Sequence, residues 1–295
     1  MGGGARLAGL GLALGLAACT TPPRYAWGSY EEQIYLTYAK PGVLSPQLQA
    51  DQLQQDRELA RAASEPLPPG WHMHLAHVYV ELGRADLAGE ELLAEKTAFP
   101  EATVLVDRLL ATLNGRGAPS GARLDPHPPR SILILPPLNE SAAAGGTYGY
   151  LSTVSRPVAE RGYYVFPVAV VDELLKTSGL PTASEMHSAP LARLRELTGA
   201  DAVLYPVLRA YGSKYHIVST DTVVRVTARL VDTRTGATLW QGAGEGRSGS
   251  GGTNNGFLGA LIEAATTKAM TSSTDAAHDV SRMANQRLFR SLKAP

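Results

Sequence analysis

The sequence predicts an α+β fold, in which an all-α helical half precedes an α/β half with a mixed β-sheet. Two patterns indicate this. Between residues 29 and 113 apolar residues recur every three or four positions, which is typical of helices that bury one face. Between residues 202 and 243 apolar and polar residues alternate, as in strands with one buried face. The string NGRGAPSGARLDPHPPR at 114–130 breaks both periods, so we expect a linker there between domains 29–113 and 131–295.

The first half is predicted to hold five helices. Gly70, Gly83 and Pro100 separate them, because glycine allows a tight turn and proline cannot continue a helix. The expected helices cover residues 30–40, 46–63, 71–82, 85–99 and 101–113.

The second half is predicted to alternate strands and helices first and to be dominated by strands later. Asp232 and Gly236 close an expected hairpin, in which Gly236 takes a positive φ. A glycine-rich loop at 249–256 then leads into two last helices. The expected strands are 131–135, 163–167, 202–211, 215–232 and 237–243, and the expected helices are 148–161, 170–177, 190–198, 257–270 and 274–292.

Cys19 is the only cysteine, and it ends a short apolar run, Leu7 to Ala18. That run has signal-peptide length and is shorter than the roughly 20 residues that span a bilayer. The string LAAC at 16–19 resembles a bacterial lipobox, which implies cleavage before Cys19 and a covalent diacylglycerol and fatty acid on it. We therefore expect a signal peptide at 1–18 and a lipidated tether at 19–28. The alternative is an ordinary secretory signal with Cys19 as a bystander.

The resemblance to lipoproteins also implies a location. Thr20, rather than an acidic residue, follows the cysteine. In the sorting rule of some bacterial lipoproteins this pattern directs the protein to the outer membrane, here at its periplasmic face.

Composition argues against a nucleic-acid partner. Lys plus Arg and Asp plus Glu both number 27, and losing Arg6 with the signal leaves 26 minus 27, or −1. We find no cluster of basic residues longer than scattered pairs, which nucleic-acid binding would usually need.

Residues 75–100 resemble one tetratricopeptide hairpin. Ala76 and Ala88 are small where two helices would approach, and Gly83 and Pro100 stand at the turn and the end. Glu95 departs from the repeat pattern, because a small residue is expected there. The resemblance implies a concave surface around Trp71 and Tyr79 that takes a peptide or a partner helix. The start of this half, YAWGSYE at 25–31, also resembles a small family of bacterial lipoproteins of unassigned function.

Three segments of the second half resemble the periplasmic domain shared by TolB, LpoB and CsgG. They are SILILPPLN at 131–139, GADAVLYPVL at 199–208 and LVDTRTGATLWQG at 230–242. Residues 150–182 and 273–289 resemble, more specifically, a family of outer-membrane lipoproteins without an assigned function, known through a vaccine-candidate antigen. The chain therefore resembles a fusion of two lipoprotein modules.

No motif in the sequence predicts catalysis, and we expect no metal and no cofactor besides the lipid. Gly244, Gly246 and Gly249 satisfy GxGxxG, but no helix begins within them, which argues against a dinucleotide site. The histidines at 72, 74 and 77 lack the further ligands of a zinc set. Asp275, His278 and Asp279 lie within one helical turn and are predicted to form either an interaction site or a structural cluster.

Apolar residues at helical spacing follow the glycine-rich loop. They are expected to face the core or, alternatively, to form a docking face for a membrane or partner. The residues predicted to bind partners are Trp71, Tyr79, Phe257, Leu258, Leu261, Asp275 and His278.

The sequence thus predicts a non-enzymatic adaptor or accessory of an envelope secretion or transport assembly. Its expected partners are the membrane and envelope proteins, including a CsgG-like lipoprotein. One alternative is an LpoB-like regulator of a peptidoglycan synthase. Another is a self-assembling ring or pore component, which would make the protein a homo-oligomer.

Overall fold

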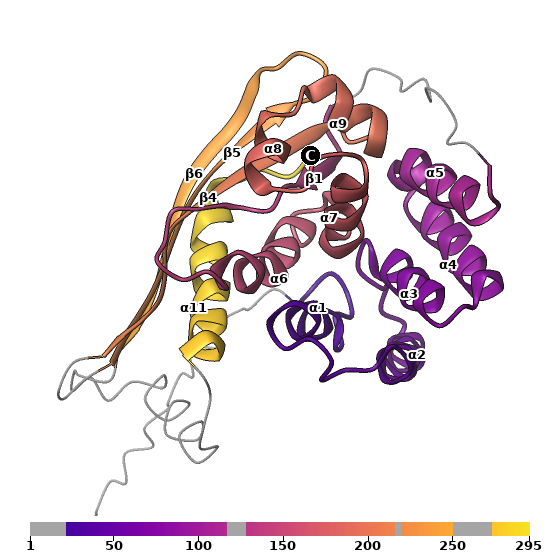
Figure 1. The fold of residues 1–295 in the computed structure, drawn as a ribbon, viewed down its shortest axis with the longest axis horizontal. Coiled ribbons are helices and arrows are strands. Elements are labelled where there is room, and N and C mark those ends of the chain that lie inside the picture. The colour runs from indigo at the N-terminus through magenta and orange to yellow at the C-terminus, as the bar shows by residue number, and fades with distance from the viewer. Residues whose placement is uncertain (1–21, 117–127, 216–219, 250–272) are drawn as a thin grey trace, which may run out of the picture.

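The computed structural model describes residues 22–116, 128–215, 220–249 and 273–295, and Figure 1 shows their arrangement. The predicted organisation is confirmed: helices form the first half, and a mixed sheet with helices forms the second. Among the described residues, no helix is both long and apolar enough to cross a membrane.

The first half consists of helices that run back and forth. Pro46 occupies the first turn of α2 and Ser45 caps it, because the Ser45 hydroxyl accepts a hydrogen bond from the Leu48 backbone at 3.2 Å. Gly83, with φ of 71°, makes the turn between α3 and α4. The elements are α1 (Tyr30–Ala39), α2 (Pro46–Ala63), α3 (Trp71–Glu81), α4 (Ala85–Ala98), η1 (Pro100–Ala102) and α5 (Thr103–Leu113).

The second half is built on a sheet with strand order β3-β1-β4-β5-β6, and β2 pairs with β4 beside that path. The pairs β1–β3, β1–β4 and β2–β4 are parallel, whereas β4–β5 and β5–β6 are antiparallel. The strands are β1 (Ser131–Ile134), β2 (Leu138–Asn139), β3 (Tyr164–Val165), β4 (Ala202–Tyr215), β5 (Thr220–Asp232) and β6 (Thr238–Gly249).

The predicted hairpin between β5 and β6 forms as expected. The Asp232 carboxylate accepts hydrogen bonds from the backbones of Arg234 and Thr235, both at 2.8 Å, and Gly236 has φ of 74°. This turn orders the two long antiparallel strands that dominate one side of the molecule (Figure 1).

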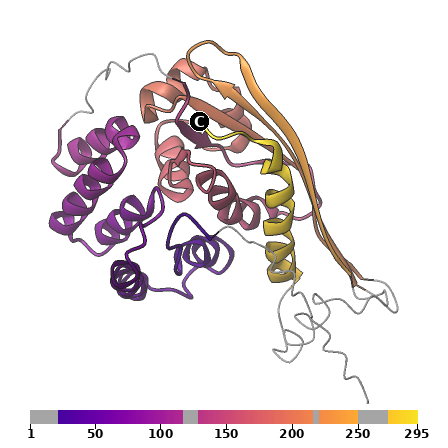
Figure 2. The same ribbon diagram turned by 180° about the vertical axis from the view of Figure 1, so that it is seen from behind.

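Helices α6 and α11 pack on each other, and α11 also packs across β4, β5 and β6. Figure 2 shows α11 lying along the long strands, with the helical half on the far side of α6 and α7. The helices of this half are α6 (Gly146–Ala159), α7 (Val168–Thr177), α8 (Ala183–Ser188), α9 (Leu191–Thr198), α11 (Ser273–Leu288) and η2 (Phe289–Ser291).

Strand β6 extends to Gly249, whereas the alternation of residue types predicted an end at 243. The reason is a stripe of glycines on the face that α11 covers. A Cβ atom at Gly244 would lie 2.2 Å from the Ala284 carbonyl oxygen, and one at Gly246 would lie 2.3 Å from that of Val280. The GxGxxG string is therefore part of a strand whose missing side chains let a helix approach closely.

The two halves share one hydrophobic core, since buried residues of both form a single cluster. Helix α1 packs on α6, α3 on α7, and α5 on α9. At one such contact, Gly199 has φ of 80° and a Cβ there would lie 2.6 Å from the Val104 Cβ of α5. The domain boundary at 114–130 remains a prediction, and the described residues on either side of it pack together.

Candidate functional site

The residues predicted to form sites fall into two groups. Cys19, Phe257, Leu258 and Leu261 lie outside the described residues, and so does the side chain of Asp275. The remaining three, Trp71, Tyr79 and His278, are all buried.

The concave surface expected around Trp71 and Tyr79 is not open to solvent. Trp71 is 0 % exposed and Tyr79 only 5 %. Helix α2 packs on α3, and its Gln54 donates a hydrogen bond to the Tyr79 hydroxyl at 2.7 Å. Both aromatic side chains therefore stabilise the helical half, and neither offers a surface to a partner in this structure.

His278 links three helices instead of facing solvent. Its ring stacks on Tyr35 of α1, with centroids 3.9 Å apart, and its Nε2 lies 3.0 Å from the Ser152 hydroxyl of α6. Deeper between α6 and α11, the Thr153 hydroxyl accepts a hydrogen bond from Asn285 Nδ2 at 3.0 Å. The structure thus places His278 in a buried polar contact between the two halves.

The three clustered histidines are separated by their partners. His72 Nδ1 lies 2.7 Å from Glu91, and His77 lies 3.4 Å from Glu173 of α7. His74 is buried, neither of its ring nitrogens has a hydrogen-bond partner among the described residues, and burial lowers its pKa to about 3. The described parts of the chain hold no group of three or more side chains suited to a metal ion.

The segment that precedes α1 is attached to the second half at Glu160, at the end of α6. The Arg24 backbone N–H donates to one Glu160 carboxylate oxygen at 2.6 Å, and Trp27 Nε1 donates to the other at 2.7 Å. The Arg156 guanidinium lies 5.4 Å from the Trp27 ring centroid, on the same side of α6. These contacts hold residues 24–27, which directly precede the helical half, against the sheet-containing half.

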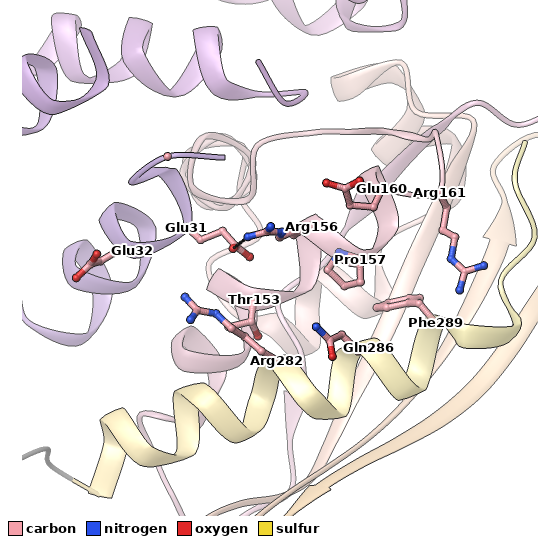
Figure 3. Close-up of a pocket in the computed structure, with 11 residues that line it drawn as sticks. Glu31, Glu32, Thr153, Arg156, Pro157, Glu160, Arg161, Arg282, Gln286 and Phe289 are labelled. Carbon is pink, nitrogen blue, oxygen red and sulfur yellow. Dashed lines mark hydrogen bonds and ion pairs between the residues drawn. The ribbon is translucent and has the colours of Figure 1, made fainter. Parts of the chain in front are cut away.

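A polar pocket of about 650 Å³ lies next to this attachment, between α1, α6 and α11. Figure 3 shows Glu31 of α1 and Arg156 of α6 pointing toward each other, with Arg282 of α11 nearby. The pocket is lined by Gly28, Glu31, Glu32, Thr153, Arg156, Pro157, Glu160, Arg161, Arg282, Gln286 and Phe289.

Glu31 is the most buried charged group of the pocket. Burial raises its pKa, and the positive charges of Arg282 and Arg156 oppose that rise. Arg156 Nη1 lies 3.2 Å from the carboxylate. The Glu31 carboxylate thus joins α1 to α6 through Arg156, and the charge of Arg282 on α11 also stabilises its ionised form.

A second contact between the halves is fully buried. Glu95 of α4 is 0 % exposed, and its Oε1 accepts hydrogen bonds from the Gly70 backbone at 2.7 Å and from the Tyr164 hydroxyl of β3 at 3.0 Å. Burial raises the pKa of this carboxyl. Glu95 is the residue that departs from the tetratricopeptide pattern, and its bond to β3 explains why a polar side chain stands there.

The lining of the pocket is rich in charge of both signs. Its described residues include three glutamates and three arginines, together with the hydroxyl of Thr153 and the amide of Gln286. Such a lining suits charged groups of a ligand or partner.

Sequence reasoning missed the residues that join the halves, namely Glu31, Glu160 and Arg156. They lie 125 residues or more apart from their partners in the chain, so no local spacing indicates the pairs. The departure of Glu95 from its repeat pattern was the available signal for the second contact.

Two family models match the chain. One, described as "Putative lipoprotein GNA1162-like", matches residues 122–294, which is more than half of the 295 residues. The other, described as "Domain of unknown function (DUF4810)", matches residues 24–109.

Individual proteins agree with the first match. A curated protein of Neisseria meningitidis serogroup B, named a putative lipoprotein, is 44 % identical over 161 residues, which cover 55 % of this chain and 75 % of that protein. The crystal structure of lipoprotein GNA1162 from Neisseria meningitidis is also 44 % identical, covering 48 % of this chain and 97 % of that one, with a TM-score of 0.40.

More distant solved structures include the PelC dodecamer from Paraburkholderia phytofirmans and the LpoB C-terminal domain from Escherichia coli. The PelC chain is 14 % identical, with a TM-score of 0.33, covering 54 % of this chain and 88 % of that one. The LpoB domain is 14 % identical, with a TM-score of 0.28, covering 39 % of this chain and 81 % of that one. On the sequence matches alone, and as residues 150–182 and 273–289 predicted, the chain belongs to the GNA1162-like family of lipoproteins.

Proposed function

We propose that this protein is a lipid-anchored adaptor, held by acylated Cys19 at the periplasmic face of the bacterial outer membrane. In this proposal its two halves bind envelope proteins and catalyse no reaction. The observation that carries it is the sole cysteine at the end of an apolar run in a chain that belongs to a lipoprotein family. The path from Cys19 to the fold is short, because Arg24 and Trp27 already bond to Glu160.

Because the two halves share one core, the anchor would present both of them to partners as one unit. Contacts at Glu31, Glu95 and His278 hold the helical half against the sheet-containing half. A lipid anchor keeps such a unit at one membrane, and confinement raises the effective concentration of neighbouring proteins. Weak binding faces can therefore still assemble a complex.

The finer assignment is an accessory of a secretion or transport assembly that resembles CsgG. It comes from the sequence resemblance at 131–139, 199–208 and 230–242. An LpoB-like regulator of a peptidoglycan synthase would need a long tether to reach its partner, and the chain between Cys19 and Arg24 is short.

The anchoring is tested by replacing Cys19. We expect Cys19→Ala to lose incorporation of labelled palmitate and to leave the membrane fraction, because no second lipid attachment is proposed. Thr20→Ala, the matched control, should keep both the label and the membrane location. A Cys19→Ala protein that still carries the label would contradict the proposal.

The adaptor role is tested by crosslinking in intact cells followed by purification of the complexes. Recovery of an outer-membrane pore or transporter lipoprotein supports the secretion assignment. Recovery of a penicillin-binding protein alone favours the regulator, and recovery of copies of this chain alone favours a ring.

A further inference from the structure

The fold begins very close to the proposed point of acylation. Five residue steps separate Cys19 from Arg24, and each step spans at most about 3.6 Å, or about 18 Å in all. Because the Arg24 backbone bonds to Glu160 at 2.6 Å, the end of α6 cannot move farther from the anchored cysteine than this length allows. One particular side of the molecule is therefore tied to the membrane.

That side carries a cluster of basic residues from three separate parts of the chain. A Cβ atom at Gly162 would lie 3.7 Å from Arg24 Cζ and 3.7 Å from Pro295 Cδ, so the lead-in segment, the end of α6 and the last residues meet. Arg161 Nη2 donates to the Arg290 carbonyl oxygen at 3.1 Å. Lys293 lies between Arg290 and Pro295, and both of these are tied to the cluster.

We call Arg24, Arg161, Arg290 and Lys293 the basic surface. Arg24, Arg290 and Lys293 are exposed, and Arg161 is half-buried. Glu160, the acidic side chain bonded within this cluster, is half-buried and already accepts hydrogen bonds from Arg24 and Trp27. The pocket beside Arg161 also holds Glu31 and Glu32, whose charges Arg156 and Arg282 balance. With Glu160 counted, the four side chains of the basic surface still leave this side with an excess of positive charge.

We propose that the basic surface rests on anionic lipid head groups of the membrane that holds the Cys19 lipid. The inference deepens the proposed function and rests on it. The attraction between basic side chains and acidic lipids decays within a Debye length, about 8 to 10 Å at ordinary salt. The tether, at most about 18 Å long, lets the basic surface enter that field and keeps it from moving more than about two Debye lengths away. The lipid surface then orients the whole fold and leaves the remaining faces for protein partners.

The experiment uses the acylated mature chain in vesicles. Ala294→Cys supplies a thiol for a fluorescent label next to the basic surface, since Cys19 is the only other cysteine and is blocked by acylation. Head-group quencher lipids then report how close residue 294 lies to the bilayer. Vesicles of phosphatidylethanolamine with phosphatidylglycerol are compared with vesicles of phosphatidylethanolamine with phosphatidylcholine.

We expect strong quenching on the phosphatidylglycerol vesicles, lost in the variant Arg161→Gln, Arg290→Gln, Lys293→Gln. Each basic residue near an anionic surface contributes about 1 kcal/mol, or about fivefold in occupancy, so removing three should lower the population whose basic surface lies on the bilayer by at least about tenfold, while the lipid still anchors the chain. High salt should have the same effect. The matched control, Arg84→Gln, Arg193→Gln, Arg247→Gln, removes three exposed arginines outside the basic surface and should behave as the unmodified chain.

Two results would contradict the binding of anionic lipids by the basic surface without bearing on acylation. They are equal quenching on both kinds of vesicle and an equal loss of quenching in the two triple variants. Palmitate labelling of the same preparations tests the anchor separately. If the chain carries no palmitate, the proposed lipid anchor is wrong. Flotation of that chain with phosphatidylglycerol vesicles would then still support binding by the basic surface, and its failure to float would contradict it.

Discussion

Helix α11 buries two faces of opposite character, and their difference explains how the molecule is held together. One face presents Val280, Ala284 and Leu288 to the glycines of β6. The other face presents His278, Ser281 and Asn285 to α6 and α1. The first face depends on close approach and the second on directed hydrogen bonds.

The two faces contribute to the fold in different ways. Contact with the glycine stripe sets how closely α11 approaches β6, because each glycine lies directly against a backbone carbonyl of the helix. Buried hydroxyl, amide and imidazole groups must each meet a partner, so they set the position of α11 along α6. Tyr35 against His278 then adds the helical half to that arrangement.

The largest effect is expected from breaking the glycine face. Gly246→Val adds a side chain whose Cβ atom would lie only 2.3 Å from the Val280 carbonyl oxygen. The helix must move away, and we expect a loss of more than about 4 kcal/mol in the free energy of unfolding, or no folded protein. Ala243→Val, on the exposed face of the same strand, should change that free energy by less than about 0.5 kcal/mol. Chemical denaturation of both variants measures the difference.

An intermediate effect comes from His74, a buried histidine that lacks the partners His278 has. Burial lowers its pKa from 6.5 to about 3, so below pH 6.5 the unfolded chain takes up a proton that the folded chain refuses. The free energy of unfolding should therefore fall by about 2 kcal/mol between pH 7 and pH 5 through this group.

His74→Phe keeps a ring against Tyr30, whose centroid lies 5.3 Å away, and removes the titration. Its unfolding free energy should depend less on pH than that of the unmodified protein, as followed by denaturation at several pH values. Identical pH dependence of the two proteins would show that His74 is not a buried neutral imidazole.

The smallest effect is the coupling across the polar face. Ser152→Ala and His278→Phe each remove one side of a 3.0 Å contact, while the phenylalanine ring introduced by the second change would keep the stacking on Tyr35. A double-mutant cycle should give a coupling of about 1 kcal/mol. Pairing His278→Phe with Thr177→Ala, whose hydroxyl bonds within its own helix, should give no coupling. Equal coupling in both cycles would mean that the 3.0 Å contact does not set the position of α11.

Much of the fold follows from local pattern. The five helices of the first half, the hairpin closed by Asp232 and Gly236, and the helix that carries His278 all appear near their expected bounds. The alternation of residue types misjudged the end of β6, because glycines on a buried face look like a loop. The short strand β2 and helix α8 were not expected, since neither is long enough to show a period.

The site was less accessible to sequence reasoning. Trp71 and Tyr79 fit a repeat surface by spacing, but α2 covers them. Glu31, Glu95 and Glu160 gained their roles from partners far along the chain. Pairwise contacts at such separation leave no periodic trace in one sequence.

Runs of consecutive residues were enough to establish the α+β class, the sole cysteine at the end of an apolar run, and the family. The folded chain was needed to show that the two halves share one core, that a glycine stripe receives α11, and that Arg24 is bonded to Glu160. Those outcomes depend on which buried faces meet. The free energy of burial depends on the area removed from water and not on how far apart two residues are in the sequence. A pattern of neighbouring residues reports only on short separations.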